Sequence, residues 1–156
     1  MINVGVVGYS GAKFNEDVAK ALLAIAFDIV ESEFKKKEYA IVSGLTDVGI
    51  PGIAYRMAEK RGWKTIGLTA EEAKEYDCYP VDEEIIVGKK FGDESKDFIE
   101  SLDCIIRIGG GKQSLKEVEM AKDRGIPAYE YDLPEIKEKK ASSTTQTTTM
   151  PEIYIG

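Results

Sequence analysis

Three short loops of the chain carry glycines where the backbone could approach a ligand closely. They span Gly8–Gly11, Gly44–Gly52 and Gly109–Ser114, and each follows an apolar run and precedes a segment with helical periodicity. Glycine leaves room for close contact, and the free N–H groups at the start of a helix attract anions. Together the loops predict a site for a nucleotide or another phosphate-bearing ligand. The alternative, that they are turns with a purely structural role, stays open.

The expected contacts to this ligand come from the glycines and from the polar residues between them. Lys112 could neutralise a phosphate, or it could be a solvated surface charge. The first loop reads Gly5-x-x-Gly8-x-x-Gly11, so the dinucleotide fingerprint GxGxxG is absent. The complete predicted set is Gly8, Ser10, Gly11, Gly44, Thr46, Asp47, Gly49, Gly52, Gly109, Gly110, Gly111, Lys112, Gln113 and Ser114.

Glu117 follows the third loop and has two interpretations. Ser114-Leu115-Lys116-Glu117 has the form S-x-x-E, a capping box in which both side chains bind backbone N–H groups at a helix start. Alternatively, Glu117 lies one turn from a phosphate site and acts on the sugar of a nucleotide. The local sequence by itself favours the cap.

The composition excludes several kinds of site. The chain has no histidine, so histidine-ligated zinc and histidine-based acid–base catalysis are excluded. A catalytic proton must therefore be carried by a carboxylate, lysine, tyrosine or cysteine, and we expect no metal and identify no resident cofactor. The net charge of −7 disfavours nucleic acid as a partner. Cys104 lies in an apolar run and is expected to be buried and not disulfide-bonded to Cys78.

Strand and helix patterns alternate along the chain, which predicts an α/β fold with three layers and a mainly parallel sheet. The helix from Lys13 to Phe34 should bury a stripe formed by Val18, Leu22, Ile25 and Ile29. The predicted strands are Ile2–Gly8, Tyr39–Ser43, Trp63–Leu68, Glu84–Gly88, Cys104–Ile108 and Ile126–Tyr131, and the other predicted helices are Ile53–Arg61, a short helix capped at Thr69–Glu72, Phe91–Ser101 and a helix after Ser114 that ends at Arg124.

The chain of 156 residues is expected to form one domain over residues 1–133, followed by a polar extension over residues 134–156. The extension contains a Ser/Thr-rich tract and ends in an apolar segment, Ile153-Tyr154-Ile155, that is either frayed or docked as a strand. No run is long enough to cross a membrane, and the first residues do not resemble a signal peptide, so we expect a cytoplasmic protein.

The loops resemble those of the SLOG superfamily of Rossmann-like proteins, which includes the LONELY GUY phosphoribohydrolases. The hallmark PGGxGTxxE is similar to the segment Gly109–Glu117. The first two glycines and the glutamate of the motif are kept, whereas Gln113 replaces its third glycine. The motif GGGxxGLMG is similar to Gly44–Gly52. The resemblance spans residues 2–131 and implies a nucleotide-binding Rossmann-like domain.

This resemblance implies two functions. Some branches of the superfamily bind ligands without known catalysis, including a molybdenum-cofactor carrier. The phosphoribohydrolases cleave the N-glycosidic bond of nucleoside 5′-monophosphates, and by resemblance Glu117 matches their catalytic carboxylate. Their essential arginine belongs to an RK pair that falls here on Glu94 and Ser95, and the nearby cations that could replace it are Lys89, Lys90 and Lys96.

Two further expectations follow from the superfamily. Single-stranded DNA handling occurs in it as well, but the acidic composition places this function last. Its members are typically dimers or larger, so we expect a homo-oligomer. The segment with Phe91 and Phe98 and the terminal segment Ile153-Tyr154-Ile155 are candidate contact surfaces, or both belong to the core of one subunit.

Overall fold

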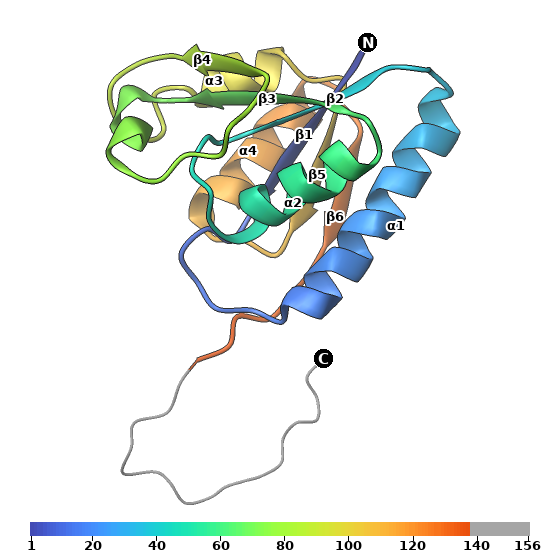
Figure 1. Ribbon diagram of the computed structural model, residues 1–156, viewed down its shortest axis with the longest axis horizontal. Helices are drawn as coiled ribbons and strands as arrows, with labels where there is room; N and C mark the ends of the chain where they lie inside the picture. Colours follow the sequence, from blue (N-terminus) through green and yellow to red (C-terminus); the bar gives the residue numbers. More distant parts are fainter. Residues whose placement is uncertain (138–156) are drawn as a thin grey trace, which may run out of the picture.

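The computed structural model describes residues 1–137, and within them six strands form one parallel sheet. The order across the sheet is β4-β3-β2-β1-β5-β6, and helices cover both faces (Figure 1). The elements are β1 (Ile2–Gly8), α1 (Glu16–Phe34), β2 (Tyr39–Ser43), α2 (Gly49–Lys60), β3 (Lys64–Thr69), the 3₁₀ helix η1 (Glu71–Glu75), β4 (Glu83–Ile86), α3 (Ser95–Glu100), β5 (Cys104–Ile108), α4 (Lys112–Asp123) and β6 (Ala128–Tyr131).

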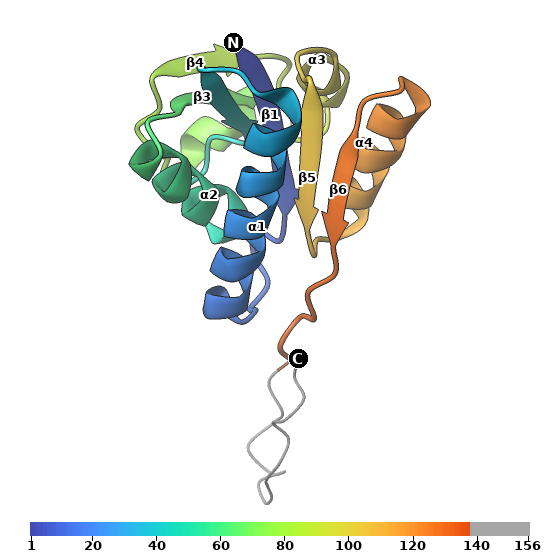
Figure 2. The ribbon, with the colours of Figure 1, turned by 90° about the vertical axis from the view of Figure 1, so that its right-hand side faces the viewer.

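The direction of the connections decides which helix covers which face. The chain moves from β1 through β2 to β3 in one direction, and from β5 to β6 in the other. Because crossovers between parallel strands are right-handed, α1 and α2 lie on one face and α4 lies on the opposite face (Figure 2). The order reverses between β1 and β5, and the carboxyl ends of the strands at such a point form a crevice that suits a ligand.

The predicted three-layer α/β fold with a parallel sheet is confirmed, and the order of strands and helices along the chain is as expected. The strands match best where an apolar run is continuous, as in Ile2–Gly8 and Cys104–Ile108. Both cysteines are free, and Cys104 is fully buried as expected. No helix within residues 1–137 is long and apolar enough to cross a membrane. The predicted terminal segment Ile153-Tyr154-Ile155 lies outside the described residues.

The predicted buried stripe of α1 was wrong. Ile25 is 48% exposed, and the other three residues of that stripe are only partly buried. The helix is apolar on most of its surface between residues 18 and 30, so periodicity alone did not decide which side faces the sheet. The residues that it buries are Ala19, Leu23, Ala26, Phe27 and Val30.

The sequence analysis also predicted the wrong first residue for three helices. α1 begins at Glu16, three residues after its predicted start, because the side chain of Asn15 accepts a hydrogen bond from the backbone N–H of Val18. α2 begins at Gly49 instead of Ile53, inside the segment that was expected to be a loop. α3 begins at Ser95, so Phe91 lies before it and is not part of the predicted helical face.

The capping box predicted at Thr69 is absent. Thr69 is the last residue of β3 and is buried, and η1 starts after Ala70 without a side-chain cap. The local sequence around Thr69 suits both the last residue of a strand and the cap of a helix. The pairing of this segment with β4 makes it part of the strand.

Tyr55 of α2 connects the helix to the edge of the sheet where the glycine loops begin. Its side chain is fully buried, and its hydroxyl lies 2.8 Å from the carbonyl oxygen of Gly44 and 3.1 Å from that of Ile66. Its ring stacks on Tyr79 with the centroids 4.9 Å apart. Tyr55 therefore holds the loop after β2 in place through its hydroxyl.

We expect Tyr55→Phe to lower the free energy of unfolding by about 1–2 kcal/mol, because it removes the hydrogen bonding of a buried hydroxyl while the ring still packs. Urea denaturation monitored by circular dichroism measures this. Tyr76→Phe is the matched control, because Tyr76 is exposed and should tolerate the change. Equal stability of both variants would show that the Tyr55 hydroxyl contributes nothing to the fold.

Candidate functional site

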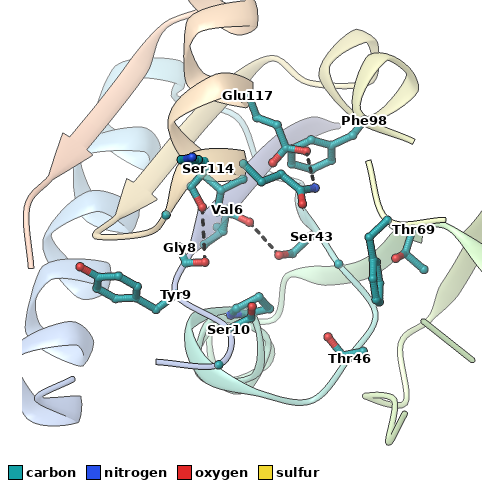
Figure 3. Close-up of a pocket in the computed structure, with 18 of the residues that line it drawn as sticks. Val6, Gly8, Tyr9, Ser10, Ser43, Thr46, Thr69, Phe98, Ser114 and Glu117 are labelled. Atoms are coloured by element: carbon teal, nitrogen blue, oxygen red, sulfur yellow. Dashed lines mark hydrogen bonds between the residues drawn. The ribbon is translucent and has the colours of Figure 1, made fainter. Parts of the chain in front are cut away.

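A cavity of about 520 Å³ opens at the carboxyl ends of the strands, between the β1–α1 loop, the β2–α2 loop and the start of α4. Ser43 and Thr69, at the ends of β2 and β3, face it as well, and Figure 3 shows how these side chains converge. Ser43 is held in place because its hydroxyl donates to the carbonyl oxygen of Val6, 2.7 Å away. The three glycine loops predicted from the sequence therefore meet around one cavity.

Some of the loop glycines are required by close packing of the backbone. A Cβ atom on Gly8 would lie 2.4 Å from the carbonyl oxygen of Ile108, and one on Gly110 would lie 2.6 Å from the Cβ of Ser114. Gly109 and Gly110 also have positive φ angles of 60° and 104°, a backbone conformation that favours glycine. Gly8, Gly109 and Gly110 thus have structural reasons to be glycine.

Gly11, Gly44 and Gly111 have no such reason. Each lines the cavity, none has a positive φ angle, and a Cβ atom on any of them would meet no protein atom within 4 Å. One of them comes from each loop. At these positions the absence of a side chain leaves open space beside the cavity.

The cavity brings together ten of the fifteen predicted site residues. Asp47 is directed elsewhere, because its carboxylate forms two hydrogen bonds of 2.7 Å with the guanidinium of Arg56. It lines a neighbouring cleft together with Gly49 and Gly52. The ten that line the cavity are Gly8, Ser10, Gly11, Gly44, Thr46, Gly111, Lys112, Gln113, Ser114 and Glu117, and the five that do not are Asp47, Gly49, Gly52, Gly109 and Gly110.

The capping box expected at Ser114 and Glu117 was wrong. α4 begins at Lys112 after Gly111 and has no side-chain cap, so Ser114 already lies inside the first turn. The Ser114 hydroxyl lies 3.4 Å from the carbonyl oxygen of Gly8, which ties α4 to the end of β1. Glu117 is directed into the protein instead of toward the helix start.

Glu117 makes its contacts with two side chains beside the cavity. Its Oε2 accepts a hydrogen bond of 2.9 Å from the hydroxyl of Ser95 in α3, and the amide of Gln113 donates to the same oxygen at 3.4 Å. Burial raises the pKa of Glu117 above its ordinary value, and the nearby carboxylate of Glu94 adds to the rise. The hydrogen bonds from Ser95 and Gln113 oppose this shift in the pKa of Glu117 but do not cancel it.

The family resemblance implied an arginine at a position where this chain has the carboxylate of Glu94, close to Glu117. Glu94 and Ser95 occupy that position, and Glu94 lines the cavity. None of Lys89, Lys90 and Lys96 is among the residues of the described chain that line it. Lys112, at the start of α4, is the cation of the predicted set that lines the cavity.

Several cavity residues were missed by the sequence analysis. Ser43 and Thr69 each end a buried apolar strand, and a polar residue at the carboxyl end of such a strand was a usable signal. Phe91 and Phe98 were assigned to a helix face, whereas both line the cavity. Within the part of the chain that is described, no group of three or more cysteine, aspartate or glutamate side chains could hold a metal ion.

Comparison with known proteins agrees with this fold. A model of a family described as the SLOG cluster4 family matches residues 1–154. No curated protein matches the chain. The molybdenum cofactor binding protein of Rippkaea orientalis has a TM-score of 0.65 and 22% identity, over 83% of this chain and 75% of that one.

Two other solved structures are similar to the same extent. The molybdenum cofactor carrier protein of Chlamydomonas reinhardtii has a TM-score of 0.64 and 19% identity, over 83% of this chain and 75% of that one. The structural genomics target TM1055 has a TM-score of 0.62 and 23% identity, over 82% of this chain and 72% of that one. At these identities the three likenesses establish a shared Rossmann-like fold.

We expect Glu117→Gln to raise the free energy of unfolding at neutral pH, because the raised pKa means that ionising the buried carboxyl costs stability. The wild type loses stability as the pH rises from about 4.3, the ordinary value for glutamate, through the higher value of Glu117 in the folded protein. The gain from the amide should therefore be largest near pH 7 and absent near pH 4.

Urea denaturation at both pH values measures this difference. Glu119→Gln, an exposed change on the same helix, is the control and should show no such dependence on pH. A loss of stability in Glu117→Gln at pH 7 would contradict the electrostatic account of this site.

Proposed function

This chain belongs to the SLOG cluster4 family, and from the cavity at its strand ends we propose that it binds a nucleotide or another phosphate-bearing ligand there. The observation that carries the proposal is the set of Gly11, Gly44 and Gly111. These three glycines come from three separate loops, line one cavity, and meet no protein atom at the place where a Cβ would be. A glycine that the fold does not require is explained by close approach of a ligand.

The start of α4 is the best place for the phosphate. The first backbone N–H groups of a helix have no partner within the helix, and they carry the positive end of its dipole. Gly111, Lys112 and Gln113 line the cavity at this end of α4, and no side chain within residues 1–137 caps it. Lys112 adds a positive charge to the same end.

The ligand is not restricted to simple nucleotides. Two solved structures with this fold are described as molybdenum cofactor binding or carrier proteins. The molybdenum cofactor therefore belongs among the ligands to be tested, and binding without catalysis suits a carrier, a sensor or a regulatory module. We also propose, from the superfamily resemblance, that the protein acts as a homo-oligomer in the cytoplasm.

A thermal-shift screen tests the proposed binding. Nucleoside mono-, di- and triphosphates and ribose 5-phosphate are added at millimolar concentration, and a ligand that binds the folded state raises the melting temperature by mass action. We expect at least one nucleotide to raise it. If neither these compounds nor the molybdenum cofactor raises it, the glycine loops have a structural role and the proposed function fails.

The glycines themselves provide the sharper prediction. We expect Gly44→Ala and Gly111→Ala to weaken binding of the compound found in the screen by about tenfold with little change in stability, because each new methyl occupies ligand space. Isothermal titration calorimetry and urea denaturation measure the two effects.

Gly125→Ala should show the opposite pattern. Gly125 ends α4 far from the cavity with a φ angle of 73°, so alanine there is strained and costs stability without affecting the ligand. If Gly44→Ala and Gly111→Ala bind as tightly as the wild type, the glycines do not mark the ligand site.

A second candidate function is hydrolysis of the N-glycosidic bond of a nucleoside 5′-monophosphate. It is favoured by Glu117, a buried carboxylate with a raised pKa that lines the cavity and could protonate a leaving base or activate water. The carboxylate of Glu94 at the position of the family's arginine weighs against it.

Release of free base from each common nucleoside monophosphate, followed by chromatography, tests the hydrolase function. If the protein is a hydrolase, Glu117→Ala should abolish release while Glu119→Ala retains it. Absence of release from every monophosphate by the wild type would leave binding as the function.

A further inference from the structure

Two buried carboxylates line the cavity. Glu94 and Glu117 are each 6% exposed, and both line the cavity. They come from different elements and are brought together by Ser95, which follows Glu94 in the chain and donates to Glu117 at 2.9 Å. No lysine or arginine in residues 1–137 forms a hydrogen bond or a salt bridge with either carboxylate.

Each of these carboxylates has one oxygen with a protein donor and one without. Oε2 of Glu117 accepts from Ser95 and Gln113, whereas its Oε1 has no hydrogen-bond donor within the described chain. Oε1 of Glu94 accepts from the backbone N–H of Gly92 at 2.9 Å, and its Oε2 likewise has no donor there. A buried carboxylate oxygen without a hydrogen-bond donor lowers the stability of the protein. The part of the cavity beside Glu94 and Glu117 is therefore suited to a ligand that supplies N–H or O–H groups.

Two aromatic rings line the same cavity. Phe98 is buried in the wall of the cavity close to Glu117 (Figure 3). Phe91 also lines the cavity, is 44% exposed, and lies next to Tyr76 with the ring centroids 6.0 Å apart. An exposed aromatic face at the edge of a ligand cavity suits a planar ring, which gains from stacking on it.

We propose that Glu94 and Glu117 recognise a planar heterocycle through two neighbouring N–H donors, as the N1–H and 2-amino groups of guanine, a 2-amino-6-oxopurine, present them. This inference rests on the proposed function, since the phosphate of the same ligand lies at the start of α4. A sugar hydroxyl could also donate to a carboxylate, but it would not use the aromatic wall. The free oxygens of Glu94 and Glu117 accept one N–H group each, and the ring stacks on Phe91.

Isothermal titration calorimetry with a matched set of monophosphates tests the inference. Guanosine 5′-monophosphate and inosine 5′-monophosphate differ only in the exocyclic amino group, and 2′-deoxyguanosine 5′-monophosphate lacks a sugar hydroxyl. We expect inosine monophosphate to bind about tenfold more weakly than guanosine monophosphate, and the deoxy compound to bind as guanosine monophosphate does.

Two variants localise the effect. In Glu94→Gln the amide oxygen should keep the bond from Gly92, so that an NH₂ group replaces the free oxygen and opposes a ligand donor. In Glu117→Gln the amide oxygen should keep the hydrogen bond from Ser95, so that the NH₂ group replaces the free oxygen here as well. We expect the preference for guanosine over inosine monophosphate to fall to about one in the variant whose carboxylate accepts the exocyclic amino group. In the other variant, whose carboxylate accepts the ring N–H group that both compounds carry, both should bind more weakly and the preference should remain. Glu135→Gln removes an exposed charge from the same cavity and should keep the preference.

The outcomes separate this inference from the proposed function. If guanosine, inosine and adenosine monophosphates bind equally in the wild type, the inference is overturned while the proposed function stands. If loss of the 2′-hydroxyl weakens binding and loss of the amino group does not, the carboxylates face the sugar and the inference is again overturned. If none of these monophosphates binds, the inference is overturned. The proposed function falls with it when no compound of the thermal-shift screen and no molybdenum cofactor binds either.

Discussion

No side chain fits between the carboxyl ends of β1 and β5. The backbone of Gly8 lies against the carbonyl group of Ile108, and Gly110 turns next to the Cα of Gly8 with a Cβ position only 3.3 Å from it. Because the two strand ends approach so closely, α4 starts directly at the point where the strand order reverses. Ser114 then reaches the carbonyl oxygen of Gly8 and fixes the helix start beside the cavity. The position of the cavity thus depends on a contact between two backbones.

The two kinds of buried charge in this protein have different consequences. Arg107 of β5 is buried, but its guanidinium donates to Glu130, to Asp132 and to the carbonyl oxygen of Gly109 at 2.8–2.9 Å. Its charge is therefore compensated within the protein, and it stabilises the loop after β5. Glu117 lies at the cavity with one oxygen that no donor of residues 1–137 reaches, which costs stability. A cost of this kind is expected at a site that is completed by a ligand.

The sign of the charge beside Glu117 also bears on the chemistry of the site. The family resemblance implied an arginine at the position that Glu94 and Ser95 occupy. An arginine there would attract an anionic group, whereas Glu94 attracts hydrogen-bond donors. The cavity and the Rossmann-like frame are present with a carboxylate at this position, and under our proposal this carboxylate meets the hydrogen-bond donors of the ligand. It supports a binding role more directly than it supports hydrolysis.

The sequence by itself determined the α/β fold, the order of its elements and the three loops that meet at the cavity, because continuous apolar runs mark strands that are buried on both faces. Tertiary structure decided what the local pattern left ambiguous. It selected the buried side of α1, started α2 at Gly49, and directed Glu117 to Ser95 instead of to a helix cap. The Ser95–Glu117 hydrogen bond joins residues 22 positions apart, and such a pairing depends on how two helices pack on the sheet, which no local pattern contains.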